Sequence, residues 1–424
     1  MRGLIASLVL ILALAPTAQE TPAARIKRIA ADARVSAAMR VIDRDHDRLV
    51  SEIITLTEIP APPFKEDAKG AAFLRMLQQT SLTDIERDKE GNVMGLRRGT
   101  GAAGGPIVVI AAHLDTVFPE GTDVRVKREG TRLIAPGVGD NTRSLAVLLA
   151  MIRAMDEASI RTPGDILFVG DVGEEGLGDL RGVKYLLKES KYKDRITQFI
   201  ALDGSGPGED IVLGGVGSRR YEVTFKGPGG HSYTAFGLVN PAFAMGNAIQ
   251  RLSAVRVPVS PKTTFSVGRV SGGTSVNSIP KDVAMEVDMR SESPLELEKL
   301  EAAFLALVKA SVADENRARS TAEGAITADV KLIGARPSGR TSPDAPIARF
   351  AAEAALASGL TPAFSFSSTD ANLPISLGIP ALRLNSGGNS DRSHSLEEWI
   401  DVEKTASVRG IRIVLLTLLA CAGM

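Results

Sequence analysis

Four short apolar segments constrain the fold of this chain most, because each is followed by a histidine or an acidic residue. The segments are 107–112, 165–169, 198–202 and 380–384. Their length and largely apolar composition are typical of strands buried on both faces of a parallel sheet. In an open α/β sheet, side chains beyond the carboxyl ends of the strands converge on one rim. We therefore predict an α/β fold with a doubly wound, mostly parallel sheet that gathers these polar residues on one rim.

The segment 217–334 has a different pattern, in which helical stretches are separated by strands of alternating polarity. The expected elements are strand 219–225, helix 241–254, strands 263–270 and 283–290, helix 294–317 and strand 326–333. This βαββαβ order predicts a small α+β domain with helices on one face of its sheet. Because the α/β pattern resumes afterwards, we expect 217–334 to be inserted between two parts, 19–216 and 335–424, of one larger domain.

The first 18 residues have the features of a secretory signal peptide. A positively charged start precedes an apolar core at 4–15, which is too short to span a bilayer, and small residues surround Ala18. We place the cleavage after Ala18 and expect an exported protein, periplasmic or extracellular. The single Cys421 excludes an intrachain disulfide, so the stability of the fold has to come from packing.

The charge balance excludes two classes of partner. The chain has 50 lysines plus arginines and 50 aspartates plus glutamates, and the basic residues form no long run. We therefore expect no binding to nucleic acid or to anionic membranes. The apolar stretch 411–422 is too short to cross a bilayer and is expected to be a core helix, so no membrane association is expected after signal removal.

Five side chains close to the predicted strand ends form an economical set of ligands for two metal ions. They are His113, Asp140, Glu175, Asp203 and His394. If Asp140 bridges, each ion receives one imidazole and two carboxylates, a set that suits zinc and is compatible with cobalt or manganese. The four positive charges of two divalent ions equal the four negative charges of three carboxylates and a bridging hydroxide. The sequence therefore predicts two divalent cations per chain, most suitably Zn²⁺, in a metal-dependent hydrolase.

Carboxylates near the two histidines have predicted supporting roles. Asp115 lies two residues after His113 on the same strand and is expected to hold the second imidazole nitrogen, which fixes the tautomer. Glu398 is expected to serve His394 in the same way. His46 lies among charged residues in a helical stretch, and we expect it on a solvated face.

The adjacent glutamates Glu174 and Glu175 cannot point the same way from an extended segment. Glu175 is therefore expected to bind metal, while Glu174 faces the attacking water as general base. The glycine-rich segment 137–141 allows a sharp turn that brings an aspartate to the rim. A phosphate cradle is the alternative for this segment, but the chain has neither a Gly-Lys-Ser/Thr motif nor the Gly-x-Gly-x-x-Gly spacing here.

Nine short motifs occur together in the chain from about residue 45 to the C-terminus. They are His113-Leu-Asp115, Gly139-Asp140-Asn141, Gly173-Glu174-Glu175-Gly176, Leu202-Asp203, Gly227-Pro-Gly-Gly-His231, Asn277-Ser-Ile-Pro280, Asp288-Met-Arg290, Ser368-Thr-Asp370 and His394-Ser-Leu-Glu-Glu398. This combination resembles the co-catalytic zinc exopeptidases and deacylases, which include peptidase T, carboxypeptidase G, carnosinase and aminoacylase. The resemblance is strongest to peptidase T-like members.

The resemblance implies a role for each candidate ligand. His113 and Asp203 would hold one ion, Glu175 and His394 would hold the other, and Asp140 would bridge them. One position departs from the family pattern, because many relatives have Asp-Asp or Asp-Lys where this chain has Asp140-Asn141. The ligand itself is kept, so the departure affects only its surroundings.

The resemblance also implies that the inserted domain mediates a homodimer and closes over the substrate. His231 would polarise the substrate carbonyl in the active site of the partner subunit. Asn277 and Arg290 would contact polar or carboxylate groups of the substrate.

Two hydrolase activities fit this pattern, and they differ in the substrate pocket. One is an exopeptidase that acts on short peptides, and the other is a deacylase that acts on N-acyl amino acids. Relatives that require a free amino group tend to have aspartate at the position of Asp203, which favours an aminopeptidase-like enzyme for di- or tripeptides. A binding protein with an inactive site is a third alternative, but it would lack a ligand or Glu174, and this chain has all of them.

Overall fold

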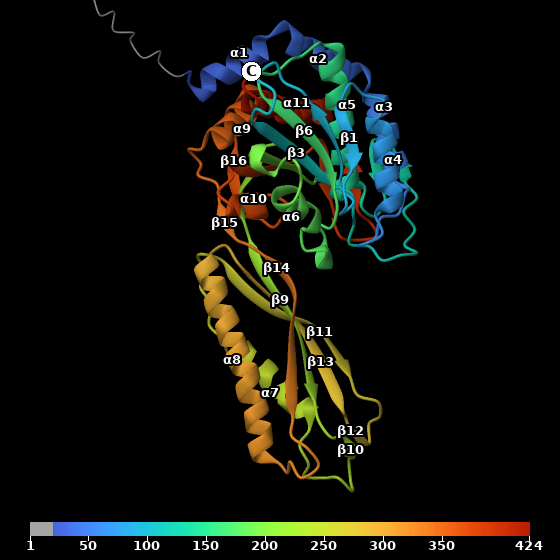
Figure 1. Cartoon of the computed structure of the whole chain (residues 1–424). Helices are drawn as coiled ribbons and strands as arrows, with labels where there is room; N and C mark the ends of the chain where they lie inside the picture. The colour runs from blue at the N-terminus through green and yellow to red at the C-terminus, as the bar shows by residue number, and fades with distance from the viewer. Residues whose placement is uncertain (1–19) are drawn as a thin grey trace, which may run out of the picture.

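The computed structural model describes residues 20–424, so the predicted signal peptide lies outside the described residues. The largest sheet has nine strands in the order β1-β2-β6-β3-β7-β17-β8-β15, with β16 paired to β8 (Figure 1). The strands are β1 (Thr83–Arg87), β2 (Val93–Arg97), β3 (Ile107–His113), β6 (Asp165–Asp171), β7 (Ile196–Leu202), β8 (Asp210–Gly215), β15 (Gly339–Arg340), β16 (Ala363–Ser367) and β17 (Ala381–Leu384). The four predicted strands are the central neighbours β6, β3, β7 and β17, and they are parallel. The predicted α/β fold class is therefore confirmed.

Helices cover both faces of this sheet, as the side-chain pattern of β3 shows. The even-numbered residues 108–112 pack into one apolar cluster with α5 and α11, and the odd-numbered residues 107–111 pack into a second cluster with α6. The helices of this part are α1 (Pro22–Ala31), α2 (Ala33–Arg44), α3 (His46–Thr57), α4 (Asp67–Leu77), α5 (Arg143–Glu157), α6 (Arg181–Lys188), α9 (Pro346–Ala357), α10 (Asn372–Ser376) and α11 (Lys404–Cys421). Between residues 20 and 424, no helix is both long and apolar enough to cross a membrane.

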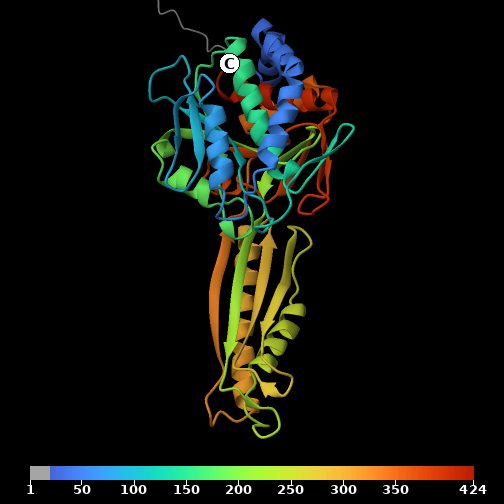
Figure 2. The ribbon, with the colours of Figure 1, turned by 90° about the vertical axis from the view of Figure 1, so that its right-hand side faces the viewer.

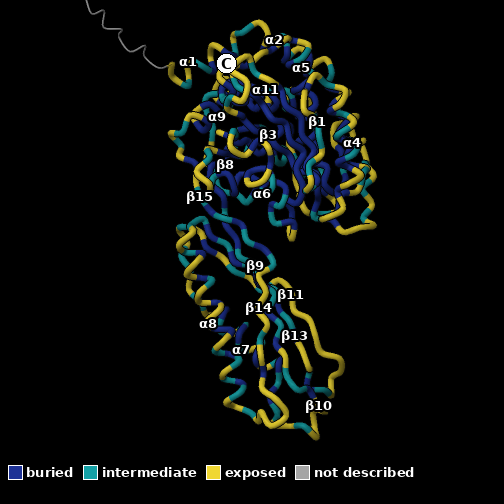
Figure 3. The backbone as a smooth tube through the Cα atoms, in the orientation of Figure 1, coloured by how far each residue is buried: buried dark blue, intermediate teal, exposed yellow. Residues whose placement is uncertain are grey.

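A second sheet of four antiparallel strands, in the order β11-β13-β9-β14, forms a separate lobe (Figure 2). Its elements are β9 (Gly217–Lys226), α7 (Pro241–Ser253), β11 (Thr263–Gly272), β13 (Asp282–Ser291), α8 (Pro294–Ala318) and β14 (Thr327–Arg336). The predicted βαββαβ order is confirmed. Alternate residues of β13, from Val283 to Met289, are buried in a cluster with α7 and α8, and the opposite face of the sheet is less buried (Figure 3).

Two small sheets complete the structure, and neither was predicted from the sequence. One has the order β18-β19-β5-β4, and the other pairs β10 with β12. Their strands are β4 (Lys127–Glu129), β5 (Arg132–Ile134), β10 (Gly230–His231), β12 (Ser278–Ile279), β18 (Asn389–Asp391) and β19 (Trp399–Asp401). At two or three residues each, they are too short to show a periodic pattern.

The prediction that His46 lies on a solvated face is wrong. His46 begins α3 and is buried, with 7% of its surface exposed. It shares the inward face of the helix with Leu49, Val50 and Ile53, at the spacing that places residues on one side of an α-helix. Burial lowers the pKa of the His46 imidazole, so the neutral form is favoured in the folded protein.

Candidate metal centre

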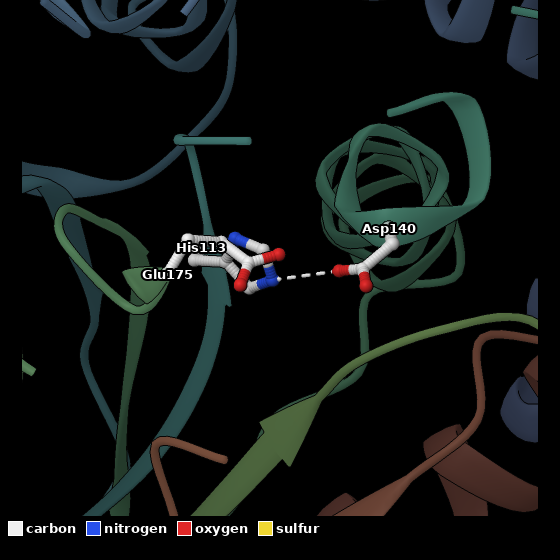
Figure 4. Close-up of side chains that lie close together, drawn as sticks. All are labelled: His113, Asp140 and Glu175. Carbon is white, nitrogen blue, oxygen red and sulfur yellow. Dashed lines mark hydrogen bonds and ion pairs between the residues drawn. The ribbon is translucent and has the colours of Figure 1, made fainter. Parts of the chain in front are cut away.

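The five predicted ligands reach one rim of the large sheet from five different segments. His113 is the last residue of β3, Asp203 directly follows β7, and Glu175 lies in the loop after β6. Asp140 lies in a single turn, Val138–Thr142, that leads into α5. His394 lies between β18 and β19 with its backbone in the left-handed region, φ 66°. Figure 4 shows three of these side chains pointing toward one another.

The two carboxylate oxygens of Asp140 face two different histidines. Oδ1 is 3.1 Å from Nε2 of His113, and Oδ2 is 3.1 Å from Nε2 of His394. His394 Nε2 is also 3.1 Å from Oε1 of Glu175, and His113 Nε2 is 3.8 Å from Oδ1 of Asp203. Around a tetrahedral zinc ion, ligand atoms lie about 3.3 Å apart. The separations and the nitrogen and oxygen donors therefore fit two adjacent metal positions that share Asp140.

The carboxylates around His113 and His394 favour positive charge at this position. Hydrogen bonds to Asp140 and Glu175 raise the pKa of His394 to about 10. Burial opposes protonation of His113, but contacts with three aspartates raise its pKa well above the ordinary value. A divalent cation supplies the same charge and displaces these protons, since metal ions bind neutral imidazole. The electrostatics of the cluster thus suit a cation site.

Asp115 supports the centre differently from the prediction. His113 Nδ1 lies 3.0 Å from the backbone carbonyl oxygen of Asp115 and 3.6 Å from its carboxylate, so the carbonyl is the closer partner of the imidazole. The fully buried carboxylate accepts backbone N–H groups of Gly173, Glu174 and Glu175 at 2.8 to 3.2 Å. Asp115 therefore fixes the loop that carries both glutamates.

Glu398 supports Asp140 rather than His394, in contrast to the prediction. Its carboxylate accepts the backbone N–H groups of Gly137, Gly139 and Asp140 at 2.7 to 2.9 Å. These amides belong to one tight turn, and charge-assisted hydrogen bonds of this kind hold a loop firmly. Glu398 and Asp115 thus have the same role: each carboxylate accepts three backbone N–H groups of one loop that carries a candidate ligand.

Asn141 connects the Asp140 turn to the loop that carries Asp203. Its amide nitrogen donates to the carbonyl of Leu202 at 2.9 Å, and its amide oxygen accepts the N–H of Gly204 at 3.3 Å. An ionised aspartate has no proton to donate to the carbonyl. The departure from the family pattern therefore gives this chain a cross-link between two ligand segments. The peptide bond between Asp140 and Asn141 is cis.

Glu174 is buried and paired with Arg336, which was not among the candidate residues predicted from the sequence. Arg336 Nη1 donates to Oε1 of Glu174 at 2.8 Å and to the hydroxyl of Ser368 at 3.1 Å, and Nη2 donates to the Glu174 carbonyl. Arg336 is the last residue of β14, two residues beyond the predicted end of the inserted segment, so the sheet of the small lobe contributes directly to the site. Burial raises the pKa of Glu174 to about 8, although the nearby guanidinium opposes the rise.

The candidate ligands open onto a cavity of about 480 Å³. It is lined by Val117, Asp140, Glu174, Glu175, Gly176, Asp203, Gly204, Ser205, Arg220, Arg290, Arg336, Ser367, Ser368, Arg383, Ser390, Ser393 and His394. Arg290, predicted to contact substrate, is among these residues. His231 and Asn277 are not: both are exposed, and they belong to the region of β10 and β12 at the far end of the small lobe (Figure 1).

The comparisons agree with this architecture. The chain belongs to the peptidase family M20/M25/M40, whose profile matches residues 109–420. Among curated proteins, it is 27% identical over 260 residues to N-acetylcysteine deacetylase of Bacillus subtilis (strain 168). That match covers 58% of this chain and 66% of the relative, slightly less than two thirds of its length.

Solved structures share the whole fold. The aminopeptidase PepT of Bacillus cereus matches with a TM-score of 0.69 at 21% identity, over 88% of this chain and 99% of its own. The YXEP protein of Bacillus subtilis, a dinuclear metal binding peptidase of the M20 family, matches with a TM-score of 0.61 at 20% identity, over 88% and 98%. The family membership and these neighbours indicate a hydrolase of the peptidase or deacylase kind.

Proposed function

We propose that this protein is a zinc-dependent exopeptidase that hydrolyses amide bonds of short peptides with two metal ions. The observation that carries the proposal is the placement of Asp140, whose two oxygens face His113 and His394 separately. In this arrangement His113 and Asp203 would hold one ion, Glu175 and His394 would hold the other, and Asp140 would be shared. When bound, the two cations lower the pKa of a water molecule and polarise the substrate carbonyl.

The residues of the chain then move the proton and hold the reacting groups. Glu174 accepts the proton of the attacking water and returns it to the departing amine nitrogen. Its carboxylate is suited to this role because burial raises its pKa toward neutrality. Arg336 keeps Glu174 oriented through the bonds to its carboxylate and carbonyl oxygens. Metal content close to two ions per chain, measured on the purified protein, tests the scheme.

The proposed substrates are di- and tripeptides with a free amino group, as expected from aspartate at position 203. The second candidate is an N-acyl amino acid deacylase, which is favoured by the similarity to N-acetylcysteine deacetylase. A matched pair separates the two: a free tripeptide and its N-acetylated form, each tested with zinc-loaded enzyme. Clear preference for the acetylated compound would reject the aminopeptidase and support the deacylase. Absence of hydrolysis of both would favour the third alternative, an inactive binding protein.

We also propose export and a homodimer formed through segment 217–334, in which His231 acts in the active site of the partner subunit. The proposal is supported by the resemblance described above and by the exposure of His231 at the end of the small lobe. Sedimentation of the mature protein tests the dimer, and detection of the protein in the periplasm or medium tests export.

A further inference from the structure

Among residues 20–424, Arg143 has the largest fully buried side chain, and its charge has no partner there. Arg143 begins α5, directly after the turn that carries Asp140, and none of its surface is exposed. Its Nε, Nη1 and Nη2 atoms all lack a hydrogen-bond partner within residues 20–424. An arginine is almost never fully buried unless it is paired, because removing an unpaired charge from water is unfavourable. The guanidinium therefore requires a partner that these residues do not supply.

The guanidinium lies against the base of the hairpin formed by β18 and β19. A Cβ atom added to Gly388, the residue before β18, would lie 3.1 Å from both Cζ and Nη1 of Arg143. It would also lie 2.5 Å from the carbonyl oxygen of Asp401, the last residue of β19. The backbone comes this close to the guanidinium because residue 388 has no side chain. Arg143 thus connects the start of α5 to the hairpin whose loop carries His394.

Asp401 is the described carboxylate whose charge acts on Arg143, but it does not pair with it. Burial lowers the pKa of Arg143 to about 10, and the negative charge of Asp401 opposes this change. The Oδ1 atom of Asp401 accepts the backbone N–H of Glu403 at 2.9 Å. A group with a pKa of about 10 keeps its proton at neutral pH. The buried positive charge is therefore present under ordinary conditions and has to be balanced.

A second buried group without a partner lies on the neighbouring helix. His46 begins α3, which packs against α5, and its Nε2 atom has no hydrogen-bond partner in the described part of the chain. Burial lowers the pKa of the His46 imidazole, and the positive charge of Arg143 lowers it further. In the neutral tautomer that has its hydrogen on Nε2, this atom is a donor. Two elements thus present hydrogen-bond donors that lack an acceptor.

Water would satisfy the hydrogen bonds of Arg143 but not its charge. A guanidinium has five N–H donors, and buried water can accept them. Water leaves the positive charge uncompensated in surroundings of low polarity, whereas an anion accepts the same N–H groups and also neutralises the charge. Because the side chain has no exposed surface, the anion has to be small. These requirements favour a monovalent halide over water or an organic acid.

We propose that Arg143 and His46 bind a small monovalent anion, such as chloride, between α3, α5 and the β18–β19 hairpin. Neither residue lines the cavity beside the candidate metal ligands, so the anion does not compete with substrate. The anion joins the turn that carries Asp140 to the hairpin that carries His394, and it stabilises the folded chain. Anion and metal therefore strengthen each other's binding by the same factor. This last step alone rests on the proposed function.

Thermal unfolding tests the stabilisation. The protein is kept at constant ionic strength while sodium gluconate, whose anion is too large for a buried site, is replaced stepwise by sodium bromide. We expect Tm to rise by about 1–2 °C for each tenfold increase of bromide above its Kd. Arg143→Met should abolish this dependence. Arg153→Met is the matched control, because Arg153 lies on the same helix and is paired with Glu52 at 2.8 Å. It should lower Tm and keep the dependence on bromide.

Crystals grown in bromide locate the ion directly. We expect an anomalous peak in contact with the Arg143 guanidinium, and ordered water alone at this position would overturn the inference. A peak without a rise in Tm that depends on Arg143 would indicate an adventitious ion only and would also overturn it. If Arg143→Met does not fold, Arg143→Lys takes its place and should shift the onset of the rise to higher bromide concentration.

Competition with a chelator tests the link to the metal centre. The Kd for zinc should be about fivefold lower in bromide than in gluconate for the wild type, and equal in the two salts for Arg143→Met. Equal zinc affinities of the wild type in both salts would overturn the link. A protein that binds no zinc in either salt would contradict the proposed function, while the bromide peak and the rise in Tm would still support the anion site.

Discussion

At the scale of single residues, Glu174 is placed for proton transfer and is not one of the candidate metal ligands. Its carboxylate is buried beside the candidate ligands and is bound by Arg336 rather than by a histidine. Glu174→Gln should therefore keep both metal ions and lose activity by about a hundredfold or more, because an amide can hydrogen-bond water but cannot take its proton. Metal analysis and turnover number measured on the same preparation check this. A variant that keeps near wild-type turnover would exclude Glu174 as the base.

Arg336 leads to a prediction about pH. Its positive charge lowers the pKa of Glu174, against the larger effect of burial, which raises it. Arg336→Met removes the opposing charge, so the pKa of Glu174 rises further and the basic form appears only at higher pH. The acidic limb of the kcat/KM profile should move upward by about one pH unit. The same substitution at the half-exposed Arg349 should leave the limb in place, and an unchanged limb in Arg336→Met would contradict the coupling.

The sequence was sufficient to select the residues with distinctive chemistry but not their partners. His113, Asp140 and Glu175 were selected because they follow strands or a glycine turn, and their oxygen and nitrogen atoms do come together. Arg336 ends β14 of the small lobe, and nothing in the local sequence pattern relates it to a glutamate far away in the chain. Which hydrogen bonds Asp115 and Glu398 make depends on loop geometry, and periodicity does not describe loops.

At the scale of structural elements, two buried carboxylates hold the loops that carry the ligands. Glu398 accepts three backbone N–H groups from the turn that presents Asp140. Glu398→Gln replaces one acceptor oxygen by a donor that faces N–H groups, so the turn loses its geometry. Metal affinity should fall by about ten- to a hundredfold, measured by competition with a chelator of known affinity. Glu397→Gln, an exposed neighbour, is the control and should bind metal normally.

Strands and helices with a clear periodic pattern were predicted, and those that depend on distant partners were not. The four central strands are apolar on both sides because helices cover both faces of their sheet. In contrast, β18 and β19 are three-residue segments that pair with each other, and β19 also pairs with the distant β5. The prediction for His46 was wrong although a periodic pattern was present. His46 was assigned to a solvated face because its sequence neighbours are charged, but its helical spacing to Leu49, Val50 and Ile53 places it on the buried face.

At the scale of the whole molecule, metal removal should affect folding as well as activity. The candidate ligands come from five segments of the large domain, so bound ions would link loops that are otherwise held by hydrogen bonds. A metal ion that binds only the folded state, at a free concentration a thousandfold above its Kd, adds about 4 kcal/mol to the free energy of unfolding. Exhaustive chelation should therefore abolish activity and lower Tm, and added zinc should restore both. Full activity after chelation would contradict the two-metal proposal.

The elongated shape of the molecule makes the role of His231 testable. His231 is exposed in β10, at the far end of the small lobe (Figure 1). The residues that line the cavity of its own chain do not include it. If His231 acts on substrate, it has to reach the active site of a second chain. His231→Ala should then keep its metal and lose turnover more than substrate binding, because a group that polarises the carbonyl acts mainly in the transition state.

Mixing two inactive variants distinguishes action between chains from action within one chain. In a dimer of one Glu174→Gln chain and one His231→Ala chain, one site combines the intact Glu174 with the intact His231, and the other site lacks both. Random exchange makes half of the dimers mixed, so about a quarter of the sites should be complete. Activity should rise toward about a quarter of the wild-type value as subunits exchange. If exchange is demonstrated by labelled subunits and activity stays at the level of the separate variants, His231 does not act across the dimer.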